Sequence, residues 1–126
     1  MNKQKTVFRL MAVVICMTML LTFASCGGAS PAEQLLGTWE TLQGGTTITH
    51  TYDGSKISVV YKNANGKEFS RSELAYVVES DNMLKAQLND TFWREYTYGE
   101  QAKSDSGYWY VDGNTLYLHN LEWTRQ

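Results

Sequence analysis

The sequence has few cysteines, prolines and histidines. Its 126 residues include two cysteines, one proline and two histidines, and both cysteines, Cys16 and Cys26, lie in the first quarter of the chain. The chain beyond residue 26 therefore has no disulfide and no thiolate chemistry. A zinc site needs three or four ligands at recognisable spacing. His50 and His119 belong to no such motif, so no metal or cofactor is predicted.

Basic residues are also few. Eleven Lys and Arg stand against thirteen Asp and Glu, for a net charge of −2. Removal of Lys3, Lys5 and Arg9 with a leader segment would leave eight against thirteen, a net charge of −5. A nucleic-acid-binding domain needs a basic stripe, so nucleic acid is excluded as a partner. The scattered acids are typical of a solvated surface.

The one long apolar run lies near the start of the chain. Three basic residues precede an apolar stretch over residues 10–21, and small residues follow it. This order is typical of a secretory signal peptide. A transmembrane helix would need roughly 20 apolar residues, so the run predicts export and not a membrane span.

Phe23-Ala24-Ser25-Cys26 resembles the lipobox of bacterial lipoproteins, although Phe23 replaces the usual aliphatic residue. The resemblance implies a signal peptide over residues 1–25, acyl chains such as palmitate on Cys26, and a flexible tether over residues 26–31. Gly27, in place of an aspartate, implies by the same resemblance an outer-membrane lipoprotein, with the periplasmic side favoured over the cell surface. The alternative is ordinary cleavage that leaves Cys26 as a free thiol.

Residues 32–126 predict an all-β domain. One helical turn over residues 32–36 would place Leu35 and Leu36 over one end of a sheet. Short alternating segments and tight turns then recur at spacings of about ten residues, with irregularities expected at residues 71–73 and at Asn120. Such a meander leaves two exposed edges unless it closes. We therefore expect a small antiparallel up-and-down β-barrel of about eight strands, in which the two ends of the chain meet.

Gly37-Thr38-Trp39 resembles the Gly-x-Trp motif that opens the first strand of lipocalins and related calycins. The resemblance implies a lipocalin-like barrel closed by a structural clamp, in which Arg125 of the last strand stacks on Trp39. The chain is shorter than classical lipocalins and lacks both their C-terminal helix and their other motifs. The ligand of a relative is therefore not carried over.

Aromatic residues are the most informative excess, with four Trp, eight Tyr and four Phe. An eight-stranded barrel is either filled by side chains or holds one small ligand, and the sequence leaves both open. The predicted ligand-binding residues are Tyr61, Tyr76, Trp93 and Trp109. Of the histidines, alternation predicts His50 at the interior or rim and His119 facing solvent.

Three functions follow from these patterns. The first is a non-catalytic lipoprotein that binds a small apolar or amphipathic molecule in the barrel mouth. The second is a filled barrel that acts through its outer surface as an interaction or inhibitor protein, with residues 99–107 and Tyr108 in contact with an unidentified protein partner. The third is a hydrolase, which would need two carboxylates across a cleft; Glu73 and Glu95, facing the barrel lumen, are the candidates.

Overall fold

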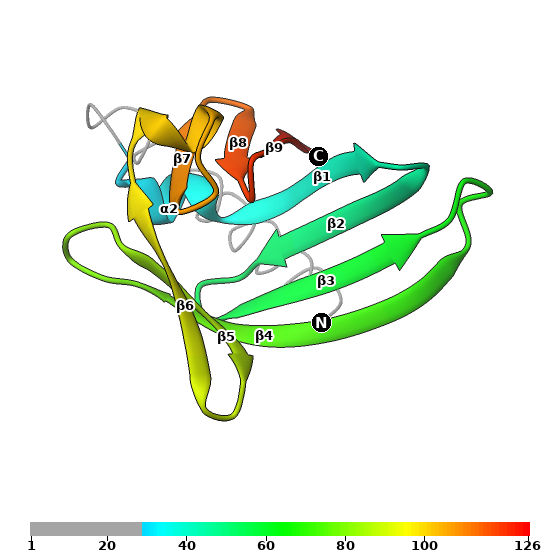
Figure 1. The fold of residues 1–126 in the computed structure, drawn as a ribbon, viewed down its shortest axis with the longest axis horizontal. Helices are drawn as coiled ribbons and strands as arrows, with labels where there is room; N and C mark the ends of the chain where they lie inside the picture. Colours follow the sequence, from blue (N-terminus) through cyan, green and yellow to red (C-terminus); the bar gives the residue numbers. More distant parts are fainter. Residues whose placement is uncertain (1–28) are drawn as a thin grey trace, which may run out of the picture. The chain divides into compact units, whose positions relative to one another are not determined.

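A closed barrel of nine strands follows one short helix in residues 29–126, the part of the chain that this computed structural model describes (Figure 1). The elements are α2 (Pro31–Leu35), β1 (Gly37–Gln43), β2 (Thr46–Tyr52), β3 (Lys56–Lys62), β4 (Glu68–Val78), β5 (Leu84–Asn89), β6 (Phe92–Tyr98), the 3₁₀ helix η1 (Glu100–Lys103), β7 (Tyr108–Asp112), β8 (Thr115–Leu118) and β9 (Leu121–Arg125). The all-β prediction is confirmed, with nine strands in place of about eight. Within the same residues no helix has the length and apolar character needed to cross a membrane.

The two ends of the barrel domain meet, as expected. β1 pairs with β2 along its whole length and with β9 at its start, where Trp39 lies opposite Arg125 and Glu40 opposite Thr124. This pairing closes the sheet on itself.

One pair of strands runs in the same direction, and there the expectation of a wholly antiparallel barrel is wrong. β6 and β7 pair in parallel through Thr97 opposite Tyr108 and Tyr98 opposite Trp109. A short hairpin turn would force antiparallel pairing. The connection over residues 99–107, which contains η1, is long enough to carry the chain back along β6 before β7 begins.

The strand break expected at residues 71–73 is absent. β4 is continuous, and it changes partner: Ala75 still pairs with β3, whereas Tyr76 pairs with β5. The β3–β4 register shifts near the start of β4, where Tyr61 pairs with Ser70 and Lys62 with Glu68, so that Phe69 is the extra residue. A second shift, between Gln87 and Asn89, makes Leu88 the extra residue of β5. β4 therefore does have a bulge, at Phe69, two residues before the expected position.

The turn between β8 and β9 consists of two residues in the left-handed region of backbone conformation. His119 has φ 59° and Asn120 has φ 60°, and Leu118 pairs with Leu121 across them. Two central residues with positive φ are typical of a type I′ hairpin turn. The last hairpin therefore turns at His119, one residue before the expected irregularity at Asn120. The in–out alternation of β8 does not extend to His119.

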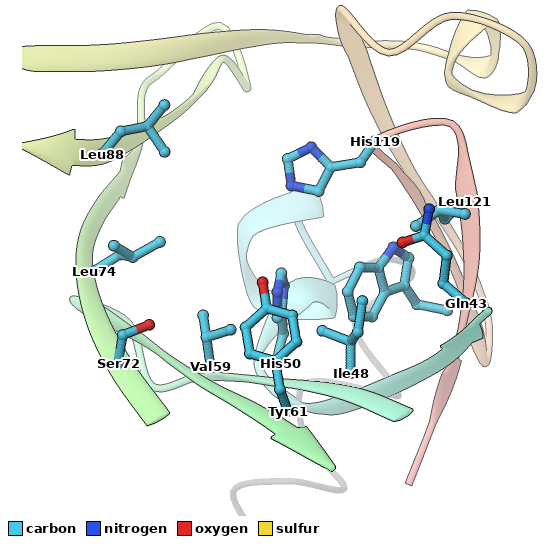
Figure 2. Close-up of a pocket in the computed structure, with 11 residues that line it drawn as sticks. Gln43, Ile48, His50, Val59, Tyr61, Ser72, Leu74, Leu88, His119 and Leu121 are labelled. Atoms are coloured by element: carbon cyan, nitrogen blue, oxygen red, sulfur yellow. The ribbon is translucent and has the colours of Figure 1, made fainter. Parts of the chain in front are cut away.

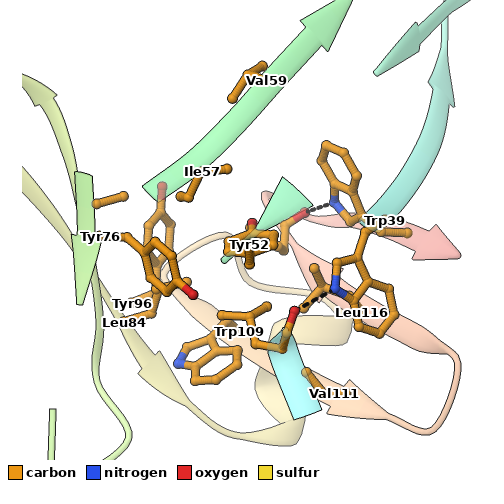
Figure 3. Close-up of a cluster of buried hydrophobic side chains, with 14 of the residues drawn as sticks. Trp39, Tyr52, Ile57, Val59, Tyr76, Leu84, Tyr96, Trp109, Val111 and Leu116 are labelled. Carbon is orange, nitrogen blue, oxygen red and sulfur yellow. Dashed lines mark hydrogen bonds between the residues drawn. The ribbon is translucent and has the colours of Figure 1, made fainter. Parts of the chain in front are cut away.

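The end of the barrel at α2 is packed with apolar and aromatic side chains (Figure 3). Pro31 occupies the first position of α2, where its missing N–H costs nothing. Leu35 is fully buried beside Trp39, whereas Leu36, also expected to cover the sheet, is 41% exposed. The fully buried large side chains are Trp39, Trp109, Trp123, Tyr52, Tyr96, Leu35, Leu84, Leu116 and Leu118.

The buried aromatic side chains also satisfy their polar atoms. Each of the three buried tryptophans donates its indole N–H to a backbone carbonyl at 2.8 to 3.0 Å: Trp39 to Leu35, Trp109 to Asn82 and Trp123 to Leu118. Buried side-chain nitrogen and oxygen atoms without a partner do not occur in residues 29–126. These bonds fix the ring orientations as well as filling space.

Candidate functional site

A cavity of about 290 Å³ lies inside the barrel at the end opposite α2 (Figure 2). It is positioned by the end of β1, the inward faces of β2, β3 and β4, the end of β5 and the β8–β9 hairpin. Its lining residues are Gln43, Ile48, His50, Val59, Tyr61, Ser72, Leu74, Leu88, His119, Leu121 and Trp123. Five of these residues are aliphatic, and the other six have a polar atom in an aromatic ring, a hydroxyl or an amide.

The wall follows from strand alternation. Successive side chains point to opposite faces of a strand, so every second residue of β2 and β3 reaches the interior. The side chains that fill the barrel near α2 lie at one end of these inward rows, and the residues of the cavity lie at the other. The sequence therefore builds a barrel that is filled at one end and hollow at the other.

His50 is buried at the base of the cavity. Its Nδ1 lies 3.1 Å from the hydroxyl of Tyr52, and its ring packs against Trp123 with a centroid separation of 4.2 Å. Burial lowers the pKa of His50 to about 3, with a smaller contribution from His119. His50 is therefore neutral at physiological pH. Its place at the base of the cavity agrees with the interior or rim position that the sequence predicted.

His119 projects over the cavity from the β8–β9 turn (Figure 2). Its Nδ1 lies 3.3 Å from the hydroxyl of Tyr96, and its ring is 6.4 Å from that of His50. Burial lowers the pKa of His119 to about 4, and Arg94 adds to this effect. The prediction that His119 faces solvent is wrong, because the left-handed turn redirects its side chain inward.

The four predicted ligand-binding residues do not gather in one place. Tyr61 lines the cavity, whereas Trp109 is fully buried in the packed end. Tyr76 is also buried there. Its hydroxyl accepts a hydrogen bond from Gly54 N at 2.8 Å, and the residue borders a separate hollow of about 230 Å³ beside α2. The barrel mouth therefore contains one of the four.

Trp93 is 42% exposed and does not line the cavity. Tyr96 is the buried residue of β6, and Trp93, three positions away, belongs to the opposite face. The prediction that Trp93 points into the lumen is wrong. It was based on the aromatic character of Trp93, although the alternation of the strand places this residue on the outer face.

The two candidate catalytic acids lie outside the barrel. Glu73 lies between two cavity-lining residues of β4 and so faces outward, where it is 3.9 Å from Lys56. Glu95 precedes the buried Tyr96 and pairs with Lys85 at 3.4 Å. The expectation that these carboxylates face the lumen is wrong.

The residues of the clamp come together at the packed end. The Arg125 guanidinium carbon lies 4.1 Å from the centre of the Trp39 ring. The same group donates to the carbonyls of Gln34 at 2.6 Å and Leu36 at 2.9 Å, so it also holds the end of α2. Gly37 has φ +117°, and a Cβ there would come within 3.2 Å of the guanidinium. This group of residues is separate from the cavity.

Sequence reasoning missed Gln43, Leu88, Leu121 and His119 as cavity residues. The signal for His119 was present: a His-Asn pair after an alternating strand can adopt the left-handed conformation that a two-residue turn needs. Leu88 lies at a register shift, where counting by twos fails.

The fold and the site define a class: a closed antiparallel-dominated β-barrel with one packed end and one open cavity. Comparison of the chain with protein-family models, with curated proteins and with solved structures finds no match. Among residues 29–126 no three His, Cys, Asp or Glu side chains gather as metal ligands. The lipidation site predicted at Cys26 and the signal peptide lie outside the described residues.

Proposed function

We propose that this protein is a non-catalytic, lipocalin-like lipoprotein that binds one small apolar or amphipathic molecule in the cavity opposite α2. The observation that carries the proposal is the cavity of about 290 Å³ inside a barrel whose other end is filled by buried side chains. The predicted acyl chains on Cys26 would hold the barrel at the outer membrane, on its periplasmic side.

The size and lining of the cavity suit a small ligand. An apolar cavity of about 150 Å³ is enough for a benzene-sized molecule, and drug-sized ligands occupy roughly 300–1,000 Å³. At about 290 Å³ the cavity fits the lower end of this range. Burial of apolar ligand surface against the aliphatic wall contributes about 25 cal/mol per Å².

The groups around the cavity favour binding over catalysis. Ser72 is the serine of the cavity wall. No hydrogen bond joins its hydroxyl to either histidine within residues 29–126. A serine nucleophile needs a base in contact with it. Glu73 and Glu95 face away and pair with lysines, so a hydrolase that uses them is disfavoured.

A titration with a blocked cavity tests the proposal. The Ser72→Phe variant places a ring in the cavity from an exposed position of β4, and Ser58→Phe places the same ring on the outer face of β3 as a control. Binding of octanol and octanoate to the purified protein, followed by isothermal calorimetry, should weaken at least tenfold in Ser72→Phe and stay unchanged in Ser58→Phe. The proposal fails if neither amphiphile binds the wild type, or if Ser72→Phe binds like wild type.

A second candidate, action through the outer surface, is favoured by one observation. Phe92 and Trp93, at the tip of the β5–β6 hairpin, are 53% and 42% exposed. The loop over residues 99–107, predicted for this role, contains the 3₁₀ helix η1, in which Ala102 is buried. A photo-crosslinker at Trp93 that captures a protein in intact cells, where one at the exposed Lys67 does not, would support this candidate.

A further inference from the structure

We propose that the ligand of the cavity carries a carboxylate head group, which Arg94 and the Nε2–H groups of His50 and His119 bind. This inference rests on the proposed binding function and names the chemical class of the ligand. It comes from the direction of the hydrogen bonds at the two histidines, from the position of one arginine and from the absence of acids in the cavity wall.

The two histidines present donors to the cavity. Each Nδ1 faces a tyrosine hydroxyl, and neither the Tyr52 nor the Tyr96 hydroxyl has another partner within residues 29–126. If each hydroxyl donates to Nδ1, both hydroxyl hydrogens are bonded. Each ring then carries its own proton on Nε2. The opposite assignment would leave two largely buried hydroxyl hydrogens without an acceptor, which costs free energy.

The protonated nitrogens point toward open space. Neither Nε2 makes a hydrogen bond to another residue of the described chain, yet no buried side-chain nitrogen lacks a partner there. The Nε2 atoms are therefore accessible, and the space that both rings border is the cavity. Two accessible N–H groups on rings that line one cavity select an oxygen that accepts hydrogen bonds.

Arg94 does not line the cavity, but it supplies a matching charge beside the second histidine. It shares the inward face of β6 with Tyr96, and its guanidinium carbon lies 5.3 Å from the centre of the Tyr96 ring. The hydroxyl of that ring bonds His119, so the cation lies close to the second histidine. Arg94 is exposed and takes part in none of the ion pairs of residues 29–126, which involve Lys56, Arg71 and Lys85.

The cavity wall contains no carboxylate that would repel an anion or attract an amine. The polar residues of the wall are Gln43, His50, Tyr61, Ser72, His119 and Trp123. The aliphatic residues Ile48, Val59, Leu74, Leu88 and Leu121 complete it and fit a hydrocarbon or aryl tail. A monocarboxylate with a short apolar tail therefore complements both parts of the cavity.

A head-group series tests the inference. Octanoate, octanol and octylamine share one tail, so their affinities for the purified protein, measured by isothermal calorimetry at pH 7, differ through the head group. We expect octanoate to bind at least tenfold more tightly than octanol, and octylamine to bind most weakly, because a charge-assisted bond is about twice as strong as a neutral one. Octyl phosphate tests whether the site needs a planar carboxylate.

Arg94→Gln tests the assigned residue. It should weaken octanoate binding about tenfold and leave octanol binding unchanged, because a hydrogen bond between charged groups is worth about one to two decades in affinity. Arg71→Gln removes the same guanidinium from an exposed pair on the outer face and should change neither. His119→Asn, which keeps the left-handed turn, should weaken octanoate selectively as well.

The possible outcomes separate the two proposals. If none of the amphiphiles binds, the binding function fails and this inference fails with it. If all three bind with equal affinity, or if Arg94→Gln binds octanoate like wild type, the carboxylate assignment alone is overturned. Octyl phosphate that binds more tightly than octanoate would also overturn the carboxylate assignment.

Discussion

His50 and His119 are two uncharged imidazoles that each contact a tyrosine hydroxyl and share one cavity. Their pKa values are lowered to about 3 and about 4 by burial. In the unfolded chain a histidine has a pKa of about 6.5. Between these values the unfolded chain binds protons that the folded barrel does not, so acid favours unfolding.

The first prediction is a loss of stability as the pH falls below about 6.5. Because the folded pKa values are depressed, the free energy of unfolding is highest above pH 6.5 and declines toward pH 4. Each histidine contributes at most about 1.4 kcal/mol per pH unit. Urea unfolding at pH 7, 6 and 5 measures the decline.

The control for this prediction is His119→Asn, since asparagine tolerates the left-handed conformation. The variant should show about half of the wild-type slope between pH 6.5 and 5, a range in which most carboxylates are ionised in both states. A wild-type free energy that is flat over this range would contradict the burial argument.

Arg125 acts through a stack and two hydrogen bonds. The second prediction is that Arg125→Ala lowers the free energy of unfolding by about 2 kcal/mol, because a cation–π contact is worth about 0.5–2 kcal/mol and the carbonyls at the end of α2 lose a charged donor. The Arg125→Ala variant should still bind ligand, since the clamp lies at the end of the barrel opposite the cavity. Arg71→Ala, in an exposed ion pair, should cost much less. Thermal melting measures both, and an unchanged melting temperature in Arg125→Ala would argue against the clamp.

At the scale of the element, the β8–β9 turn decides where His119 lies. The third prediction is that Asn120→Gly is tolerated, whereas Asn120→Val costs about 1–3 kcal/mol, because a β-branched residue strains the left-handed conformation that Asn120 holds at φ 60°. Denaturant unfolding monitored by tryptophan fluorescence measures the difference. Equal stability of the two variants would show that the turn is not held in this conformation.

Other elements show where sequence reasoning succeeds and where it fails. The closure of β1 on β9 could be predicted, because Gly37-x-Trp39 marks the first strand and Arg125 the last strand of the barrel. The parallel pairing of β6 and β7 could not, since no local pattern in residues 99–107 encodes the direction in which a loop returns.

The candidate site was harder to predict than the fold. Tyr61 follows from the alternation of β3, but His119 and Leu88 lie at a turn and at a register shift, where alternation no longer indicates direction. Trp93 was misplaced for a related reason: a large aromatic residue on a two-sided aromatic strand can belong to either face. The elements that follow a strict period were predictable, and the irregular positions, which form the cavity, were not.

At the scale of the whole molecule, the barrel interior divides into a filled part and an empty part. Tryptophan and tyrosine rings with satisfied polar atoms form the first, and a wall of smaller side chains forms the second. The aromatic content allowed either a filled barrel or one that holds a ligand, and the structure combines the two. The packed end supplies rigidity to a domain without disulfides, and the open end remains free for a ligand.

The fourth prediction concerns the proposed anchor. Cells that express the full chain and are fed radiolabelled palmitate should incorporate label into the protein, and the protein should sediment with outer membranes. Cys26→Ala should abolish the label and release the protein from that fraction, because it loses the acylated residue. Cys16→Ala is the matched control and should retain the label. Unlabelled wild-type protein would contradict lipidation.

The most direct test of the binding proposal is the contact map of a bound probe. Nuclear Overhauser contacts from the methylenes of octanoate should reach the methyl groups of Leu74, Leu88 and Leu121, which line the cavity, and should not reach Leu36, which borders the separate hollow beside α2. Contacts confined to Leu36, or the absence of any contact at saturating octanoate, would contradict a ligand-binding cavity in this barrel.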